Sequence, residues 1–387
     1  MINYRTNGII DPPIVEFKNK LIGLCNKSRL IDLSQAVPSY PMPAKMKRSI
    51  IDNFDDKLSF YSEDQGLLEL REEICALHNV GGVKLSPSNV LVTAGASQGA
   101  FSLFTAMFKE GDKVALPVPY YFNYDMGLKM LGVEPVYYFL DEEDNFKLKF
   151  NKLDKDIFKT CKAFIVISPN NPTGAEYDIE ELKLLYNECK KNNLTLIADE
   201  AYGFFAKHSY PHSSLLSHIK SLDDLVIINS FSKTYSLTGF RIGYLLLNED
   251  LMKQVMKVQD TVIICAPRIS QIAALLGLRD CRDWLAEKIN YVNNNVVDFT
   301  KQFDSNLKKF KLSSCSNFFA YVKHPFVSKS SDQVAELIAK EADIMVLPAS
   351  IFGPGQESFF RLAFGNLSSK NELNQVVERL LKLENNI

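Results

Sequence analysis

The segment Ser230-Phe231-Ser232-Lys233 places a lysine beside two hydroxyl groups, and Gly239-Phe240-Arg241 follows shortly after it. A lysine amine that has lost its proton can attack a carbonyl carbon and form a Schiff base. Serine hydroxyls and an arginine side chain are groups that can hold a phosphate. A single lysine is usually a solvated surface residue, so its chemistry depends on the groups that lie near it.

Other segments of the chain supply groups that complement this lysine. Small residues at a turn into a helix let backbone N–H groups approach an anion, and Gly95, Ala96 and Ser97 form such a turn. The remaining groups are an aromatic ring, an amide, and a carboxylate followed by a phenol, namely Tyr121, Asn171, Asp199 and Tyr202.

Each of these groups follows a short apolar run that is typical of a β-strand. Seven such runs alternate with helical patterns, as βαβ units do, at residues 90–93, 113–117, 134–139, 163–168, 194–199, 225–230 and 241–247. Several are apolar on both faces, which indicates strands covered by helices on both sides. Ligands bind beyond the carboxyl ends of such strands, so we expect these groups to meet at one edge of the sheet.

This combination of groups suits a phosphorylated heteroaromatic aldehyde, namely pyridoxal 5′-phosphate. The lysine can form a Schiff base with the aldehyde, and the carboxylate can pair with the pyridinium nitrogen. The small residues and the arginine can hold the phosphate, while the aromatic side chain can stack on the ring.

Five sequence blocks then identify a family. SFSKTYSLTGFRIGY resembles the S-x-S-K-x-x-x-x-x-G-x-R-x-G signature of the fold-type I pyridoxal phosphate enzymes, the class I/II aminotransferases. YSEDQGLLELR, NNPTG, DEAY and FFRLAFG match further blocks of that family in its usual order. Any one block is weak, but together they extend the resemblance over about residues 30–370.

The resemblance implies a role for each residue around the cofactor ring. Lys233 would hold the Schiff base and carry the proton between the substrate Cα and the cofactor C4′. Asp199 would pair with the pyridinium nitrogen and keep it protonated, which makes the ring an electron sink. Asn171 and Tyr202 would bond to the ring 3′-oxygen, and Tyr121 would stack on the ring.

The resemblance also assigns the phosphate contacts. The side chains of Ser230 and Arg241 would bind the phosphate together with the backbone of Gly95, Ala96 and Ser97.

Four further residues are expected at the substrate and at the subunit interface. The resemblance implies that Tyr61 reaches the phosphate of the partner subunit, which makes the protein a homodimer. Arg361 would clamp the substrate α-carboxylate, a task that suits its bidentate fork, with Asn171 beside it. Ala36 stands where many relatives carry glycine, at a place where the substrate side chain is usually read.

We expect an α/β fold with a seven-stranded, mostly parallel sheet between helices. The pattern changes near residue 280 to a long helix, then strand-like runs at 318–323, 344–348 and 359–365, a helix near 331–341 and a final helix. The sequence therefore predicts a large cofactor-binding domain at 46–280. A smaller α+β domain would combine residues 1–45 and 281–387.

Composition excludes several classes of function. The 387 residues include 44 Lys and Arg against 46 Asp and Glu, so no basic excess favours nucleic acid or a membrane surface. The apolar runs are far shorter than the roughly 20 residues of a membrane span, and the N-terminus has no signal-like apolar stretch. Seven scattered cysteines without a CxxC pair fit reduced thiols, so we expect a cytoplasmic protein.

Three histidines, His208, His212 and His218, lie close together in the sequence. A proline interrupts them and no HExxH motif is present, so we interpret this stretch as a surface loop and expect no metal.

The predicted function is transfer of an amino group between an amino acid and a 2-oxo acid, through the Lys233 Schiff base and pyridoxamine phosphate. A C–S lyase, a decarboxylase, or a pyridoxal phosphate-dependent oxidase or hydroxylase would share the cofactor motifs, although Arg361 argues against decarboxylation. A non-catalytic regulator and an NAD-linked enzyme are weaker alternatives, since the N-terminal part is short and no GxGxxG follows a strand.

The sequence does not name the substrate. Dicarboxylate-specific relatives use a second arginine from the partner subunit, and the corresponding stretch, KVQDTVIICAPRISQ, holds only Arg268, beyond the usual place. Aspartate specificity of the usual kind is therefore not supported.

Overall fold

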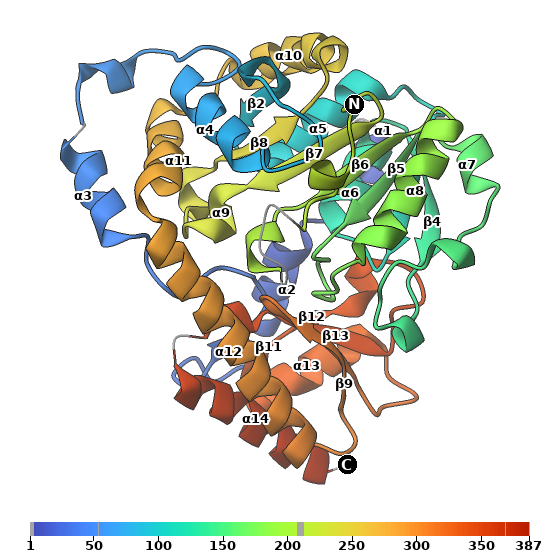
Figure 1. The fold of residues 1–387 in the computed structure, drawn as a ribbon. Helices are drawn as coiled ribbons and strands as arrows, with labels where there is room; N and C mark the ends of the chain where they lie inside the picture. Colours follow the sequence, from blue (N-terminus) through green and yellow to red (C-terminus); the bar gives the residue numbers. More distant parts are fainter. Residues whose placement is uncertain (1–3, 53, 207–212, 368, 387) are drawn as a thin grey trace.

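The computed structural model describes residues 4–52, 54–206, 213–367 and 369–386. Figure 1 shows a large part built around a broad sheet, and below it a smaller part that contains the C-terminus. None of the described helices combines the length and the apolar character that a membrane crossing requires.

The broad sheet has seven strands in the order β2-β8-β7-β6-β5-β3-β4. Only β8 runs antiparallel to its neighbours, and the remaining pairs are parallel. Central strands such as β5 are buried along their whole length, as an apolar run covered on both faces must be. The strand bounds are β2 Val90–Thr93, β3 Lys113–Val118, β4 Glu134–Phe139, β5 Ala163–Ile167, β6 Thr195–Asp199, β7 Leu225–Ser230 and β8 Gly243–Leu246. The predicted fold class is confirmed.

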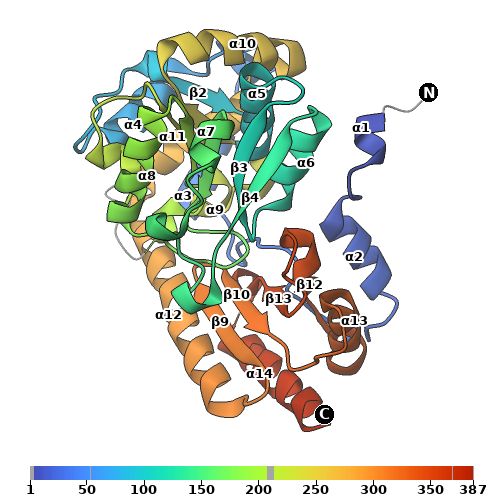
Figure 2. The same ribbon diagram turned by 90° about the vertical axis from the view of Figure 1, so that its right-hand side faces the viewer.

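Helices cover the two faces of this sheet (Figures 1 and 2). Their ends follow ordinary helix chemistry: α8 has Glu180 and Glu181 in its first turn and two lysines in its last, which complements the helix dipole. The helix bounds are α3 Ala44–Asp52, α4 Leu68–His78, α5 Ala96–Met107, α6 Phe122–Met130, α7 Ile157–Thr160, α8 Ile179–Lys191, α9 Phe231–Thr234, α10 Glu249–Ile263 and α11 Arg268–Asp280.

The smaller part holds an antiparallel sheet in the order β12-β13-β10-β9, and β1 pairs in parallel with β11. The strand bounds are β1 Ile31–Asp32, β9 Lys311–Ser316, β10 Phe319–Lys323, β11 Ile344–Met345, β12 Leu347–Pro348 and β13 Phe359–Leu362. The helices are α12 Arg282–Asn306, α13 Ser331–Ala342 and α14 Lys370–Asn385. The apolar run at 344–348 thus divides between two sheets instead of forming one strand.

The N-terminal segment bridges the two parts (Figure 2). Helix α1, Tyr4–Asn7, contacts α6, and its Arg5 forms an ion pair with Glu110 of the large part. Helix α2, Pro13–Leu21, contacts α13, and its Lys20 pairs with Glu336 there. We keep the domain division at residues 45/46 and 280/281 as a proposal, in which this segment crosses from one domain to the other.

Candidate active site

A cavity of about 550 Å³ lies where the carboxyl ends of the parallel strands meet the smaller part. Most of the predicted site residues line it, namely Ala36, Ala96, Ser97, Tyr121, Asn171, Asp199, Tyr202, Ser230, Lys233, Arg241 and Arg361. From the predicted set, Gly95 and Tyr61 do not line it. Another cavity, of about 680 Å³, includes residues 174–180 and none of the predicted site residues.

Asp199 is the last residue of β6, and its carboxylate is buried at the floor of this cavity. The hydroxyl of Tyr124, on α6, donates a hydrogen bond of 2.5 Å to Oδ2, and the N–H of Ala201 donates to Oδ1 at 2.9 Å. Burial raises the pKa of Asp199, whereas these two bonds act in the opposite direction. A carboxylate held this way can pair with a protonated ring nitrogen.

Lys233 lies on α9, the short helix that begins directly after β7. The helix starts at Ser230, whose hydroxyl accepts a hydrogen bond from the N–H of Ser232 at 3.1 Å. The Lys233 amine donates a hydrogen bond to the backbone oxygen of Ala36. Burial, reinforced by the charges of Arg361 and Arg241, lowers the pKa of Lys233 to about 7. Near neutral pH a large share of this amine is therefore unprotonated and nucleophilic.

The turn before α5 and the side chain of Arg241 form one wall of the cavity. Gly95 has φ +86°, and a Cβ built on it would lie 2.6 Å from Nη2 of Arg241, so only glycine lets the guanidinium pack this closely. Gly95 therefore supports Arg241 without lining the cavity itself. The helix N-terminus, this guanidinium and the Ser230 hydroxyl together form a donor set that fits a phosphate.

Arg361 comes from β13 and is buried. Its Nη1 donates to Oδ1 of Asn171 at 2.8 Å, and its Nη2 donates to the backbone oxygen of Ser34 at 2.5 Å. The guanidinium lies 5.2 Å from the ring centre of Phe319 and 5.1 Å from that of Phe352.

This arginine has no carboxylate partner within the part of the chain that the structure describes, and its buried Nε has no hydrogen-bond partner there. Burial lowers the pKa of Arg361 to about 10. A buried guanidinium without a counter-ion is costly, so the arrangement favours an anionic ligand at this place.

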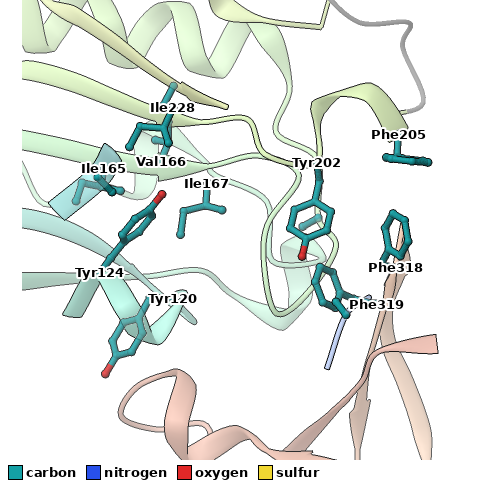
Figure 3. Close-up of a cluster of buried hydrophobic side chains, with 14 of the residues drawn as sticks. Tyr120, Tyr124, Ile165, Val166, Ile167, Tyr202, Phe205, Ile228, Phe318 and Phe319 are labelled. Atoms are coloured by element: carbon teal, nitrogen blue, oxygen red, sulfur yellow. The ribbon is translucent and has the colours of Figure 1, made fainter. Parts of the chain in front are cut away.

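Two aromatic side chains complete the walls. Tyr202 packs its ring 5.1 Å from Phe319 and 5.9 Å from Phe318, which joins the loop after β6 to the smaller part, and Figure 3 shows the three rings together. Tyr121 accepts a hydrogen bond at its hydroxyl from Nδ2 of Asn123 at 2.8 Å. Both rings are held by contacts of their own chain, so they form a preset surface for a flat ligand.

The sequence prediction missed several residues that line the cavity: Ile14, Gln35, Val37, Asn123, Tyr124, Ile167, Ala201, Ser232 and Thr238. Tyr124 is the most important of them because it bonds directly to Asp199. Its only sequence signal is its position three residues after Tyr121, one helical turn further along α6.

Tyr61 lies outside the cavity of its own chain. Its side chain is 75% exposed, and the neighbouring apolar side chains Ile51, Phe54 and Phe60 are exposed as well. The structure of one chain thus leaves this predicted phosphate contact unmet.

The predicted histidine loop falls only partly within the described residues. His208 and His212 lie outside them, and His218 is exposed. Among the described residues, no group of three His, Cys, Asp or Glu side chains gathers as metal ligands would.

Comparison with known proteins now places the chain. Residues 28–380 match the family model "Aminotransferase class I and II". The chain belongs to the class I and II aminotransferases. These enzymes use pyridoxal 5′-phosphate, so the predictions of family, cofactor and amino-group transfer are confirmed. The alternatives based on other pyridoxal phosphate reactions, on a regulator and on NAD find no support in these matches.

This aminotransferase is similar to relatives with different substrates. It is 27% identical over 356 residues to an aspartate aminotransferase of Pyrococcus horikoshii, covering 91% of this chain and 90% of the relative. It is also 27% identical to aromatic-amino-acid aminotransferase 2 of Thermococcus litoralis, covering 92% and 91%. An aspartate aminotransferase structure from Thermotoga maritima matches with a TM-score of 0.87 and 26% identity, over 99% of this chain and 100% of that one.

Proposed function

We propose that this aminotransferase acts as a homodimer on α-amino acids with neutral side chains, using the cavity at the strand ends as its active site. The observation that carries the proposal is the buried guanidinium of Arg361, which has no carboxylate partner among the described residues and lies in the same cavity as Lys233 and Asp199. Arg361 binds the α-carboxylate of the substrate, and Asn171 holds the guanidinium in place through its amide oxygen.

Lys233 supplies the covalent anchor and the base. The bound cofactor provides the carbonyl carbon and the electron-withdrawing ring that the reaction requires. Lys233 Nζ takes the proton from Cα of the bound amino acid, for which a pKa of about 7 is well suited. The same nitrogen would then deliver a proton to C4′ of the cofactor, which completes the first half-reaction. In the second half-reaction it would carry a proton in the opposite direction, from C4′ to Cα of the product amino acid.

Asp199 and Tyr124 fix the charge at the other end of the ring. The carboxylate of Asp199 keeps a proton on the cofactor nitrogen, because a protonated nitrogen next to a buried carboxylate forms a favourable ion pair. Tyr124 orients this carboxylate through its hydrogen bond of 2.5 Å. Ser97, Ser230 and Arg241 hold the phosphate, so the ring is fixed at two ends.

A second copy of the chain completes the site. Exposed apolar side chains follow one another along the chain at Ile51, Phe54, Phe60 and Tyr61, which is unusual for a surface left in water. In the proposed dimer this surface is covered, and the hydroxyl of Tyr61 donates a hydrogen bond to the phosphate in the partner's site. That arrangement accounts for a tyrosine that is 75% exposed in the single chain.

The cavity favours a neutral substrate side chain. Its described lining includes only three cations, Lys233, Arg241 and Arg361, and each already has a role. The rest of the lining includes the apolar side chains of Ile14, Val37 and Ile167, together with amide and hydroxyl side chains. A second substrate carboxylate would be desolvated there without a partner, which is unfavourable.

A donor panel tests this proposal. Formation of the 2-oxo acid is measured by chromatography for leucine, methionine, phenylalanine, glutamine and aspartate, with the matching decarboxylated amines as controls. We expect neutral amino acids to exceed aspartate at least about tenfold in kcat/KM, and the amines to be poor substrates. If aspartate proved the best donor, the proposed preference for neutral side chains would be refuted.

The same panel with Arg361→Ala tests the carboxylate clamp. The loss of a charge-assisted bidentate contact is worth roughly 2–4 kcal/mol, so kcat/KM for amino acid and oxo acid should both fall about 30- to 1000-fold. Arg361→Lys should recover little, because an ammonium lacks the planar fork. Unchanged kinetics in Arg361→Ala would refute the role of this arginine.

A further inference from the structure

The segment that carries Tyr61 is held by two fully buried glutamines from α10 and α11. Gln271 accepts a hydrogen bond at Oε1 from the N–H of Leu67 at 2.7 Å, and its Nε2 donates to Oγ of Ser62 at 2.7 Å. Gln259 donates from Nε2 to the backbone oxygen of Asp64 at 2.8 Å. Both amides are completely inaccessible to solvent.

The same segment is pressed against β2, an edge strand of the large sheet. The N–H of Val92 donates to the oxygen of Gln65 at 2.9 Å, and Gln259 Nε2 also donates to the oxygen of Val92 at 3.1 Å. Gly66 has φ +103°, and a Cβ built on it would lie 2.5 Å from Val92. Because only glycine fits at this close contact, the segment can pack against β2 in one register only.

Burying amides to hold a surface segment is unfavourable unless they are hydrogen-bonded, because each donor or acceptor that loses water must find a partner. Their advantage is direction, since hydrogen bonds fix backbone groups at defined positions whereas apolar packing does not. Tyr61, directly before Ser62, makes no hydrogen bond or ring contact within the described part of its own chain. The segment that these hydrogen bonds fix therefore begins with Tyr61, whose side chain makes no such contact within the described part of its own subunit.

We propose that Gln271, assisted by Gln259, is a positioning residue for the active site of the partner subunit. Its amide bonds fix Ser62 and Leu67, and this presets Tyr61 to meet the phosphate bound in the partner's cavity. The inference rests on the proposed function, in which Tyr61 serves the second copy. A subunit thereby influences cofactor binding in its partner through a residue that contacts neither cofactor nor substrate.

The first test compares cofactor dissociation constants, measured by equilibrium dialysis with pyridoxal 5′-phosphate. Gln271→Met keeps the side-chain volume but removes the hydrogen bonds to Ser62 and Leu67, together with one to the backbone oxygen of Ala266. We expect it to weaken cofactor binding about five- to fiftyfold, as Tyr61→Phe should. The double variant should be no weaker than Tyr61→Phe alone, because both changes remove the same contact. Gln254→Met, an exposed glutamine of α10, is the matched control and should bind normally.

Hybrid dimers separate an effect on the partner from an effect within one subunit. The hybrid pairs a Gln271→Met chain with a Lys233→Ala chain. The cavity of the Gln271→Met chain keeps its Lys233 and receives Tyr61 from the Lys233→Ala chain, in which Gln271 is intact. The other cavity has no Lys233, so borohydride fixation after dialysis measures cofactor bound in the first cavity only. We expect this first cavity to bind the cofactor as tightly as the wild type does, although the Gln271→Met homodimer binds weakly. Weak binding in the hybrid would overturn the proposal.

Two outcomes keep this inference separate from the proposed function. If Tyr61→Phe leaves cofactor affinity unchanged, the role of Tyr61 in the partner's site is wrong, and the inference falls with it. If Tyr61→Phe weakens binding but Gln271→Met does not, only the inference is wrong. If Gln271→Met does not fold, Ser62→Ala is used instead, because it removes a single hydrogen-bond partner of Gln271. Its homodimer should bind the cofactor more weakly than the wild type, by a smaller factor, and its hybrid with Lys233→Ala should bind as tightly as the wild type.

Discussion

Lys233 illustrates how much a single residue depends on its surroundings. Its amine lies beside two guanidinium groups in a place where water is largely excluded, and its pKa falls to about 7. The ordinary lysine pKa is about 10.4, so the lowered pKa makes the amine of Lys233 more reactive in neutral solution than an ordinary lysine. In the proposed function, the surroundings of Lys233 thus prepare it as a nucleophile before any ligand is bound.

Amine labelling of the chain freed of cofactor tests this preparation. We expect Lys233 to react with a trinitrobenzenesulfonate reagent along a pH profile with its midpoint near pH 7. Peptide mapping by mass spectrometry gives the extent of labelling at each lysine. A midpoint for Lys233 close to the ordinary lysine pKa of about 10.4 would show that burial does not control its charge.

Tyr124 is the residue-scale feature that sequence analysis overlooked. Tyr124→Phe removes the hydrogen bond to Asp199, and burial then raises the pKa of Asp199 further. One such bond is worth about 1.4 kcal/mol, so we expect kcat/KM to fall about tenfold and its acid limb to move to higher pH. The pH profile of the donor half-reaction measures both.

Tyr138→Phe provides the control for this prediction. Tyr138 is also buried and donates to the backbone oxygen of Ile165 at 2.8 Å, but it does not line the cavity. Its loss should lower stability and leave the pH profile in place. An equal shift in both variants would mean that general loosening, and not the contact with Asp199, moves the profile.

At the scale of elements, the proposed active site depends on how the smaller part is held, since β13 carries Arg361. Near the end of α14, the carboxylate of Glu384 accepts hydrogen bonds from the N–H groups of Lys308, Lys309 and Phe310 at 2.8–3.0 Å. These three groups immediately precede β9, the edge strand of the small sheet. Glu384 therefore joins the last helix to the start of this sheet.

Glu384→Gln should destabilise the protein by about 2 kcal/mol at pH 7. Burial acts to raise the pKa of Glu384, but the backbone N–H groups outweigh it and the folded-state pKa is lowered. A lowered pKa contributes stability that is fully present above the unfolded value, about 4.3, and is lost as pH falls through the folded value. In urea unfolding, the difference between wild type and variant should therefore shrink below pH 4. A pH-independent difference would contradict this role.

The sequence predicted those elements whose burial requires a recognisable pattern of apolar residues. Six strands of the large sheet, all but the edge strand β4, are buried along nearly their whole length. They were recognisable because a strand covered on both faces must be apolar along its length, which sets it apart from the polar turns around it. Two strands were missed. β1 has only two residues, too few to form a pattern. β9 reads KLSSCS and is half-buried at a sheet edge, so it carries no alternation of apolar and polar residues.

Site residues were predictable where they belong to a family block next to a strand end. Tyr124 bonds to a residue 75 positions away, and no local pattern reveals such a pair. Ile14 reaches the cavity only because the N-terminal segment crosses between the two parts. Tyr61 differs from these missed residues: the sequence predicts its phosphate contact, but this contact requires a second chain.

At the scale of the whole molecule, dimerisation and cofactor binding should depend on each other. Phe54→Asp places a charge on the exposed apolar surface, where Phe54 is 71% accessible in the single chain. We expect monomers in sedimentation analysis at micromolar concentration, with cofactor retention reduced along with them because Tyr61 no longer reaches a partner.

Val327→Asp is the control, because Val327 is fully exposed in the smaller part and should leave the dimer intact. A Phe54→Asp protein that stays dimeric, or a monomer that retains the cofactor as tightly as the wild type, would contradict the coupling.

The most direct test of the central claim asks which lysine the cofactor occupies. The protein is incubated with pyridoxal 5′-phosphate, reduced with borohydride, digested and mapped by mass spectrometry. The active site described above predicts a single pyridoxyl group, on the peptide that contains Lys233, and none in Lys233→Ala. Labelling of a different lysine, or equal labelling in Lys233→Ala, would show that the cavity at the strand ends is not the catalytic centre.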